Sequence, residues 1–440
     1  MPRARHPQPH LTHDDGAGNV AGPWARFDDL TPQGRSFVLD RCNAVLVARA
    51  HAEVVDVIEG AAEAARSGRW VAGFVAYEAA AGLDRALRTR EPAGPVPLAW
   101  FGVFDRSRDR PPVHTQREVG AAWKLEWEAA DHARRVSRIR DHIAAGDTYQ
   151  VNLTARAHAV IADPLGLYSS MAVAQQGAHN AFIETGTHTV VCASPELFFT
   201  LDGDDLTTRP MKGTARRGRW PEEDEERAAA LITSAKDRAE NIMVVDLTRN
   251  DIGRLARTGA VEVTGLAQLE RYPTVWQLTS TVVGRLRPGV SLGAVFEAMF
   301  PAGSVTGAPK PRTMSLIAAL EESPRGVYCG AVGWIAPGTR RRASFAVAIR
   351  TATVENATGQ AEYGAGGAIT WPSDTAAEWD ELAVKMKVLD HTPLPPGLLE
   401  TMAADAGRGP VRLERHLARM RASARYFSLP FDEAVARRRS

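Results

Sequence analysis

Lys212 is the residue of this chain whose setting most suggests chemistry, because it stands between Pro210 and the pair Gly213-Thr214. A proline and a glycine so close by leave a lysine little freedom of backbone position. If burial also removes the side chain from water, its pKa falls, and the neutral amine can act as a nucleophile or a base. The ordinary alternative is an exposed loop lysine, since lysine is mostly found at protein surfaces. Residue types alone leave both readings open.

Glutamates on two predicted helices are candidate metal ligands. Glu240 lies at the rim of an apolar helical face, four residues after Lys236, so it is either half of an ion pair or a ligand. Glu378, Glu381 and Lys385 occupy positions i, i+3 and i+7 of the second helix, which places them on one face. Two glutamates a turn apart, with a third from another helix, are oxygen ligands suited to Mg²⁺.

Only one of the two glutamates of the second helix has an obvious structural role that could replace metal binding. Thr375 and Glu378 have the spacing of a capping box, in which the glutamate would serve the helix end. Glu381 has no such role available at the helix end. The spacing therefore makes Glu381 the clearer ligand candidate.

Three further features could hold an anionic group. The loop 300–310 carries two glycines and two hydroxyl side chains directly before a predicted helix, 312–320. Arg350 ends the apolar run 345–349, and an arginine at a strand end is a good clamp for a carboxylate. The glycine-rich stretch 363–369 offers bare backbone N–H groups, although it lacks the spacing of a dinucleotide-binding loop. A capping loop, a solvent-facing arginine and a tight corner are the respective structural alternatives.

Strands must position most of these residues. Runs rich in branched and aromatic residues predict strands at 70–77, 98–104, 149–154 and 189–192, and a strand or the start of a helix at 272–284. The strands often follow one another across short turns, which favours antiparallel sheet. Helical periodicity predicts helices at 51–67, 131–145, about 291–299, 312–320 and 374–389, and one helix that begins at the acidic run 222–226 and continues through Met243.

The composition limits the function classes. With 440 residues and a net charge of +1, the chain can bury a large core but gives no electrostatic reason to expect binding to nucleic acid or an acidic membrane. No apolar run is long enough to span a bilayer, and the N-terminus lacks the apolar segment of a secretory signal. The three cysteines lack CxxC spacing, which predicts a reducing compartment and no structural zinc site. We expect a cytoplasmic protein.

Several motifs follow one another along the chain. They are GDTYQVNLT at 146–154, SPE at 194–196, PMKGT at 210–214, AKDRAEN at 235–241, the segments 246–254 and 303–310, and the stretch 363–385. Over roughly residues 35–390 these motifs resemble the chorismate-utilising enzymes. The resemblance implies an α+β fold of two large antiparallel β-sheets packed as a sandwich, with helices outside and the active site between the sheets.

The resemblance also implies roles for individual residues. Lys212 would be a catalytic nucleophile and Glu196 a general acid or base. Glu240, Glu378 and Glu381 would bind Mg²⁺. The implied substrate-binding residues are Gln150, Thr214, Thr306, Arg350, Gly366, Gly367 and Lys385. Among these, Arg350 and the backbone at Gly366 and Gly367 would hold the pyruvyl carboxylate of chorismate, and Lys385 would contact its ring carboxylate.

Two positions separate the branches of the family. Branches that add water carry a lysine where this chain has Gln150, and a glutamine cannot deprotonate water. Branches that form anthranilate carry a small residue where this chain has Lys212. The lysine therefore implies amination at C4 of chorismate: Lys212 attacks C2 as the C4 hydroxyl leaves, and ammonia then adds at C4. The product would be 4-amino-4-deoxychorismate, for 4-aminobenzoate and folate biosynthesis.

Two features qualify this expectation. None of the three cysteines lies in a Gly-x-Cys-x-Gly turn, so ammonia should come from a separate glutamine amidotransferase subunit or from solution. Relatives commonly carry a histidine where this chain has Gln277, which can hydrogen-bond the leaving hydroxyl but cannot protonate it. An anthranilate-forming enzyme and a non-catalytic binding protein are the alternatives. Lys212 disfavours the first, and its presence together with Glu196 and Glu240 disfavours the second.

The expected domain plan has five parts. They are a disordered tail at 1–22, the N-terminal part of the catalytic body at 23–125, the chorismate-binding catalytic region at 126–390, a linker at 391–397 and a C-terminal segment at 398–440. Residues 398–402 and 413–420 resemble the beginning of a fold-type IV pyridoxal-phosphate enzyme. We expect this segment to be a truncated or degenerate second domain without cofactor activity, either poorly ordered or docked on the body.

Overall fold

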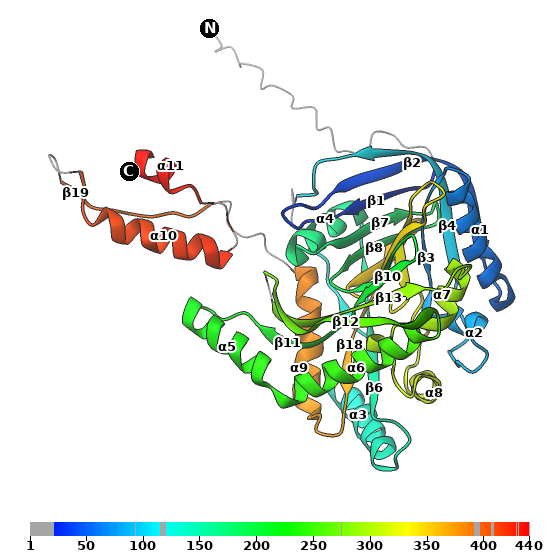
Figure 1. Ribbon diagram of the computed structural model, residues 1–440. Helices are drawn as coiled ribbons and strands as arrows, with labels where there is room; N and C mark the ends of the chain where they lie inside the picture. Colours follow the sequence, from blue (N-terminus) through cyan, green and yellow to red (C-terminus); the bar gives the residue numbers. More distant parts are fainter. Residues whose placement is uncertain are drawn as a thin grey trace, which may run out of the picture.

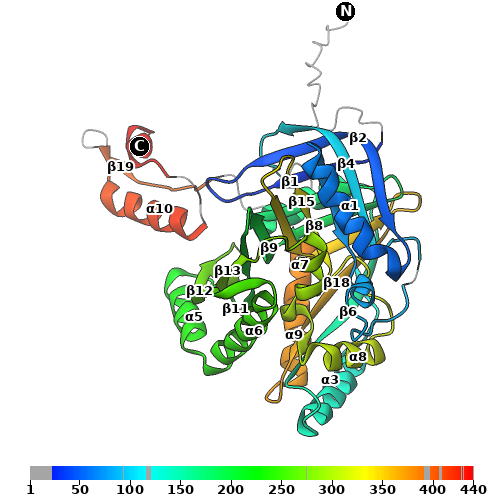
Figure 2. The ribbon, with the colours of Figure 1, turned by 45° about the vertical axis from the view of Figure 1, so that its right-hand side comes forward.

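A computed structural model describes residues 22–92, 94–114, 120–273, 275–390, 397–405, 409–427, 429 and 431–439. The predicted tail, 1–22, and the predicted linker, 391–397, lie outside the described residues except for Gly22 and Gly397. Figures 1 and 2 show a body of strands covered by helices, with a small helical segment near the C-terminus standing beside it.

The first β-sheet is built around the strand that begins at Gln150. In spatial order it contains β6 (Gln150–Val160), β18 (Gln360–Ile369), β17 (Thr351–Glu355), β8 (His188–Ser194), β7 (His179–Glu184) and β1 (Trp24–Asp28), all paired antiparallel. Two short strands, β5 (Lys124–Leu125) and β14 (Gly307–Ala308), also pair with β6. Because β6 is buried from Gln150 to Ala157, both of its faces are covered at that end.

The second β-sheet carries the lysine segment. In spatial order it contains β2 (Ser36–Ala48), β4 (Ala99–Asp109), β3 (Trp70–Val75), β15 (Ala331–Ile335), β16 (Arg342–Val347), β9 (Leu197–Asp202), β10 (Asp205–Arg209), β13 (Val275–Leu286) and β12 (Ala256–Arg271). β11 (Met211–Arg216) follows β10 along the same edge of β13. Residues 275–286 are therefore strand, which decides the alternative left open by the sequence.

The two sheets are continuous through β1 and β2. β1 pairs with β7 of the first sheet and with β2 of the second, so the described strands of the body form one antiparallel network. A cluster between the sheets contains buried side chains of both, including Phe27, Ile183, Phe74 and Val332. The predicted α+β sandwich of two antiparallel sheets is confirmed, and the structure adds this shared edge.

Helices cover the outer faces of the two sheets (Figure 1). α1 (Val54–Arg66), α2 (Ala80–Leu83) and α7 (Leu292–Met299) pack on the second sheet, and α3 (Ala129–Ala144), α4 (Pro164–Gln175), α8 (Lys310–Leu320) and α9 (Thr375–Met386) pack on the first. Each group contributes branched and aromatic side chains to its own buried cluster. Burial of these apolar faces is the main stabilising term of the fold.

The helix predicted from the acidic run through Met243 is wrong as a single element. The chain instead forms α5 (Pro221–Thr233) and α6 (Ala235–Gly253), separated at Ser234. Ser234 has an extended backbone, with ψ of 113°, and its hydroxyl accepts the backbone N–H of Asp237 at 3.2 Å. A serine that caps a new helix start explains the break. Glu240 consequently lies in the second turn of α6.

Gly73 provides a stability prediction for the central strands. A Cβ at Gly73 would lie 2.0 Å from the backbone oxygen of Trp100 and 2.8 Å from Cα of Phe101. Because β3 is held by ladders on both sides, it cannot move away, and we expect Gly73→Ala to lower the free energy of unfolding by about 3 kcal/mol. Gly60→Ala in α1 is the matched control, because its nearest contact is Cδ1 of Leu46 at 3.4 Å.

The control should raise the free energy of unfolding by about 0.5–1 kcal/mol, because alanine suits a helix interior better than glycine. Urea unfolding followed by circular dichroism measures both values. A Gly73→Ala protein with wild-type stability would contradict the close packing of β3.

The C-terminal segment touches the body at the end of one helix. It contains β19 (Ala404–Asp405), β20 (Gly409–Pro410), α10 (Leu413–Phe427) and α11 (Glu433–Arg439). Arg271 donates to the carbonyl of Arg425 at 2.6 Å, and the Tyr426 hydroxyl donates to the carbonyl of Gly218. These two hydrogen bonds join the end of α10 to the body, and whether the segment is docked stays a prediction. Among the described helices, none has the length and apolar character required to cross a bilayer.

Candidate active site

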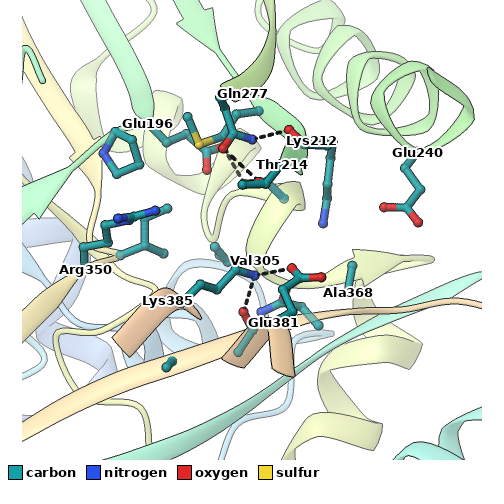
Figure 3. Close-up of a pocket in the computed structure, with 18 of the residues that line it drawn as sticks. Glu196, Lys212, Thr214, Glu240, Gln277, Val305, Arg350, Ala368, Glu381 and Lys385 are labelled. Carbon is teal, nitrogen blue, oxygen red and sulfur yellow. Dashed lines mark hydrogen bonds and ion pairs between the residues drawn. The ribbon is translucent and has the colours of Figure 1, made fainter. Parts of the chain in front are cut away.

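A cavity opens between the two sheets at the end away from their shared edge. Its volume is about 160 Å³. β6 and β18 of the first sheet line one side, β11 and β13 of the second sheet line the other, and α6 and α9 contribute side chains at the opening. Figure 3 shows the labelled side chains converging on this space from both sides.

Lys212 enters the cavity from a β-bulge in β11. Met211 lies opposite Thr279 and Thr214 lies opposite Gln277. The two residues between them, Lys212 and Gly213, therefore face a single residue of β13, so β11 contains one extra residue here. Bulges redirect side chains. Gly213 has φ of +90°, and a Cβ there would lie 3.1 Å from Cβ of Asp237, so a glycine is required. The predicted restraint on the lysine by its glycine neighbour is thus explained by the backbone.

The surroundings of the Lys212 amine affect its pKa in opposite directions. Removal from water lowers its pKa, the carboxylates of Glu240, Glu196 and Glu381 raise it, and the Lys385 ammonium lowers it again. Burial has the largest effect, so the pKa of Lys212 lies below its ordinary value. A larger fraction of neutral amine follows at any given pH, and the neutral amine is the nucleophilic form.

Gln277 holds the backbone beside the lysine. Its Nε2 donates to the carbonyl of Gly213 at 2.8 Å, and its Oε1 accepts the Thr214 hydroxyl at 2.9 Å. Nδ2 of Asn241 lies 3.5 Å from the carbonyl of Lys212 on the other side. Both ends of the glutamine amide are therefore occupied by β11, and its contribution in this structure is to position the lysine segment. The second N–H of Nε2 is not used by these two bonds, so a hydrogen bond from Gln277 to a leaving hydroxyl stays a prediction.

Glu196 lies at the inner end of the cavity, where it is 3 % exposed. Burial raises its pKa to about 7, although the Ser304 hydroxyl bond, the Lys212 charge and the Met211 backbone N–H all act to lower it. The Ser304 hydroxyl donates to Oε1 of Glu196 at 2.6 Å. At neutral pH this carboxyl is partly protonated, so it can give or take a proton as a substrate reacts.

The three predicted metal ligands face the same cavity. Glu240 comes from α6, whereas Glu378 and Glu381 come from α9. Lys385 pairs with Glu381 at 2.7 Å and donates to the carbonyl of Gly366 at 2.6 Å (Figure 3). Burial raises the pKa of Glu240 and of Glu378, and Lys385 lowers the pKa of Glu381.

The capping-box alternative for Glu378 is wrong. Asp374 caps α9, because its side chain accepts the backbone N–H groups of Ala376 and Ala377 at 3.1 and 3.0 Å. The Glu378 carboxylate instead accepts the Ser373 hydroxyl at 2.6 Å. The helix end does not use Glu378, whose other oxygen remains directed toward Gly367.

The carboxylates of Glu240, Glu378 and Glu381 are the kind of ligand that Mg²⁺ prefers, although in this structure they do not surround one point. Oε1 of Glu240 is buried and lacks a hydrogen-bond partner among the described residues, and the nearest cation is Lys236 Nζ at 4.0 Å. Such an orphaned buried oxygen points to a missing cation or water. In the part of the chain that the structure covers, no three metal-ligating side chains are close enough to hold an ion as they stand. In this structure the Glu381 carboxylate forms an ion pair with the Lys385 ammonium instead.

Arg350 brings a guanidinium to the cavity. The described residues include no carboxylate that forms an ion pair with its guanidinium, and its surroundings lower its pKa by removing it from water. Its backbone has φ of +49°, a strained conformation for a non-glycine residue that often marks a functional position. The guanidinium lies near Tyr363 and Tyr272. An unpaired, poorly hydrated arginine is a strong site for a carboxylate.

Three predicted substrate-binding residues do not line the cavity: Gln150, Thr306 and Gly367. Gln150 is fully buried, and neither amide atom has a hydrogen-bond partner among the residues described. The Thr306 hydroxyl donates to the carbonyl of Ala302 at 3.2 Å. Gly367 borders the carboxylates, because a Cβ there would lie 3.5 Å from oxygens of both Glu378 and Glu381.

The cavity also contains residues that were not predicted to bind substrate or metal or to act in catalysis. They include Asn152, Ser304, Tyr328, Lys236 and Asp237. Alternation along the predicted strand 149–154 would have placed Asn152 on the face of Gln150. No local pattern marks Tyr328, whose ring lies against Gly364 of β18 and lines the cavity.

These features fit a family assignment that covers most of the body. Residues 33–390 match the family model described as chorismate binding enzyme, and the chain belongs to this family. It is 41 % identical over 264 residues, 60 % of this chain and 36 % of the relative, to the aminodeoxychorismate synthase of Streptomyces griseus. It is 39 % identical over 258 residues, 58 % of this chain and 52 % of the relative, to anthranilate synthase component 1 of Neisseria meningitidis.

A solved structure resembles most of the body. Anthranilate synthase component I from Streptococcus pneumoniae aligns with a TM-score of 0.72 and 25 % identity, over 82 % of this chain and 93 % of that one. The chain spans about half of the Neisseria relative and about a third of the Streptomyces relative. The relatives thus carry two activities at nearly equal identity, and the cavity must distinguish them.

Proposed function

We propose that this chain aminates chorismate at C4 and forms 4-amino-4-deoxychorismate, a precursor of 4-aminobenzoate and folate. The observation that carries the proposal is Lys212, a lysine with a lowered pKa on a β-bulge inside the cavity of a chorismate binding enzyme. The name of the Streptomyces relative supports this activity, and the name of the Neisseria relative supports anthranilate formation instead. Identity alone does not separate the two, whereas a nucleophilic lysine serves only the first.

Chorismate carries two carboxylates, and the cavity offers a cation for each. Arg350 would bind the pyruvyl carboxylate, assisted by backbone N–H groups near Gly366. Lys385 would contact the ring carboxylate from α9. Both cations are restrained, Arg350 by its strained backbone and Lys385 by the carbonyl of Gly366, so the ring would be held in one orientation.

The neutral Lys212 amine would then attack C2 of the ring. Both ring double bonds shift, C1=C2 to C1=C6 and C5=C6 to C4=C5, the C4–O bond breaks, and the hydroxyl leaves as water with one added proton. Ammonia attacks C4, both double bonds shift back, and the C2–N bond to Lys212 breaks, with the proton lost by the added ammonia balancing the one gained by the Lys212 nitrogen. Two substitutions replace one difficult displacement, and the amine ends at C4 because Lys212 occupies C2 in the intermediate.

Glu196 would supply the proton for the leaving hydroxyl. Its pKa of about 7 provides a protonated fraction at neutral pH. Gln277 cannot take this role, since an amide has no dissociable proton at this pH and both of its ends bond to β11. The proton released by the Lys212 amine balances the one that Glu196 gives.

Glu240, Glu378 and Glu381 would hold Mg²⁺ at the opening of the cavity. A bound Mg²⁺ would neutralise these carboxylates and attract the ring carboxylate of the substrate. The orphaned oxygen of Glu240 supports this assignment, as do the raised pKa values of Glu240 and Glu378.

Ammonia would come from a glutamine amidotransferase subunit. The word component in the name of the Neisseria relative supports a second subunit. The three cysteines are all free, which supports a reducing compartment and therefore a cytoplasmic location. All cavity-lining residues fall between Asn152 and Lys385, which supports the proposed catalytic region at 126–390.

Incubation with chorismate, Mg²⁺ and an ammonium salt tests the proposal, with products identified by mass spectrometry. The expected product is 4-amino-4-deoxychorismate without anthranilate. Anthranilate as the product would instead assign the chain to the other activity of its relatives. Binding of chorismate without any consumption would support the non-catalytic alternative.

Glu240→Gln tests the metal assignment. The substitution keeps the side-chain shape but removes a charged ligand. Loss of a residue that only hydrogen-bonds a metal ligand commonly lowers metal affinity about 10–100-fold, and loss of the ligand itself should cost at least as much. We therefore expect the Mg²⁺ concentration for half-maximal activity to rise at least about 10-fold, with activity partly restored at high Mg²⁺. Glu297→Gln on α7, outside the cavity, should leave the Mg²⁺ dependence unchanged. An unchanged Mg²⁺ dependence in Glu240→Gln would remove Glu240 from the ligand set.

A further inference from the structure

A buried ion pair lies directly behind the cavity wall. Arg325 is 1 % exposed and Glu321 is 3 % exposed. Nε and Nη2 of Arg325 donate to the two carboxylate oxygens of Glu321 at 3.0 and 2.6 Å. Neither residue lines the cavity, and the proposed reaction gives them no role.

The remaining donors of Arg325 bind two backbone carbonyls of the cavity wall. Nη1 donates to the carbonyl of Val305 at 2.7 Å, and Nη2 also donates to the carbonyl of Asn152 at 2.8 Å. Asn152 belongs to β6, whereas Val305 ends the turn η3 (Gly303–Val305). One guanidinium therefore connects two separate walls of the cavity. A lysine could not replace these four hydrogen bonds, because it has only three donors and lacks the planar fork that binds both carboxylate oxygens.

The turn that Arg325 fixes carries a contact to the catalytic carboxyl. Ser304 is the residue before Val305, and its hydroxyl donates to Oε1 of Glu196 at 2.6 Å. A second tie holds the same turn to β6, since the Asn152 N–H donates to the carbonyl of Thr306 at 2.8 Å. The contacts thus run without a gap from Glu321 through Arg325 and Val305 to Ser304 and Glu196.

We propose that Arg325 is a positioning residue of the active site, which fixes the turn 303–305 against β6 so that Ser304 remains hydrogen-bonded to Glu196. Its kinetic consequence rests on the proposed function, whereas its effect on the Glu196 carboxyl does not. If the turn moves, Ser304 leaves Glu196, and the carboxyl loses the hydrogen bond that favours its charged form. The charged group that then still faces Glu196 is Lys212, with the Tyr272 hydroxyl nearby.

The pKa of Glu196 distinguishes a positioning role of Arg325 from a role in fold stability alone. Loss of the Ser304 bond raises the pKa of Glu196, because that bond lowers it now. A residue that only stabilised the fold would change the unfolding temperature and leave this pKa in place. The carboxyl titration is therefore the informative readout.

Arg325→Lys is the test, with Arg135→Lys as the matched control. Arg135 also donates to a backbone carbonyl near the end of α8, that of Leu320 at 2.9 Å, and its side chain is 12 % exposed, but it does not line the cavity. Infrared difference titration against Glu196→Gln measures the pKa of Glu196 in each folded variant. Ser304→Ala provides the shift expected when the bond is lost completely.

We expect Arg325→Lys to shift the pKa of Glu196 upward, in the direction of Ser304→Ala, and Arg135→Lys to leave it unchanged. With chorismate and ammonium, kcat of Arg325→Lys should fall about 10-fold or more, with KM nearly unchanged, because a displaced catalytic group costs rate rather than binding. An unshifted pKa in folded Arg325→Lys would overturn the proposal.

The proposal remains testable if Arg325→Lys fails to fold or if the wild-type protein is inactive. If Arg325→Lys does not fold, Glu321→Gln takes its place, since it leaves the guanidinium present but releases its fixed orientation, and its pKa shift must have the same sign. If wild-type protein does not aminate chorismate, the proposed function fails, and the infrared titration alone decides the positioning role.

Discussion

Lys212→Ala is expected to abolish the formation of 4-amino-4-deoxychorismate, with kcat falling by about 10³-fold or more. The substitution removes the amine that would attack C2 and leaves ammonia with only the direct displacement at C4. The bulge and Gly213 should persist, because Gln277 and Asn241 bind the backbone of this segment and not the lysine side chain. Quantifying the product by mass spectrometry at saturating ammonium measures the loss.

Two further variants separate nucleophilicity from charge. Lys212→Arg keeps a cation in the cavity but supplies no usable amine, so it should be as inactive as the alanine variant. Lys236→Ala removes a cation from the opening of the same cavity, where the side chain is 48 % exposed, and should cost less than about 10-fold. Near-normal product from Lys212→Ala would exclude the covalent route, and an active Lys212→Arg would show that only the charge matters.

Glu196→Gln is expected to lower kcat by about 10²–10⁴-fold and to remove one limb of the pH profile. The carboxyl acts as the acid only when it is protonated. Its protonated fraction falls as the pH rises through about 7, so wild-type kcat should decline above that pH when the concentration of neutral ammonia is held constant. Lys212 contributes in the opposite direction, because its neutral form increases with pH.

The coupled pair should therefore give a bell-shaped profile, whose two apparent pKa values belong to both groups together. The measurement is kcat from roughly pH 5.5 to 9 for wild type and variant. Glu362→Gln is the matched control, since burial also raises the pKa of that carboxyl but the side chain lies outside the cavity. An alkaline limb that survives in Glu196→Gln would assign the acid to another group.

The fold was predictable where local pattern decides it. Strand-forming runs and short turns predicted antiparallel sheets, and helical spacing predicted α1, α3 and α9 closely. The pairing of β1 with strands of both sheets was not predictable, because hydrogen bonding between distant segments leaves no local pattern. The break at Ser234 was missed since an acidic start and an apolar face continued across it, although a serine followed by Asp237 is a recognisable cap.

The site was predictable where a residue type is unusual in its setting. Lys212, Arg350 and Glu381 were all selected from sequence, and all three line the cavity. Gln277 was noticed, but its role required the structure, because only the bulge shows that its amide bonds to β11. Arg325 gave no signal in sequence, since it acts through the backbone carbonyls of two distant segments.

The most direct test of the central claim is the mass of the protein itself after brief mixing with chorismate and Mg²⁺ in the absence of ammonia. The covalent route predicts an adduct equal to chorismate less one water, located on the peptide that carries Lys212, and its loss when ammonium is added. No adduct on that peptide, in protein that forms 4-amino-4-deoxychorismate once ammonium is present, would contradict the role of Lys212 as nucleophile.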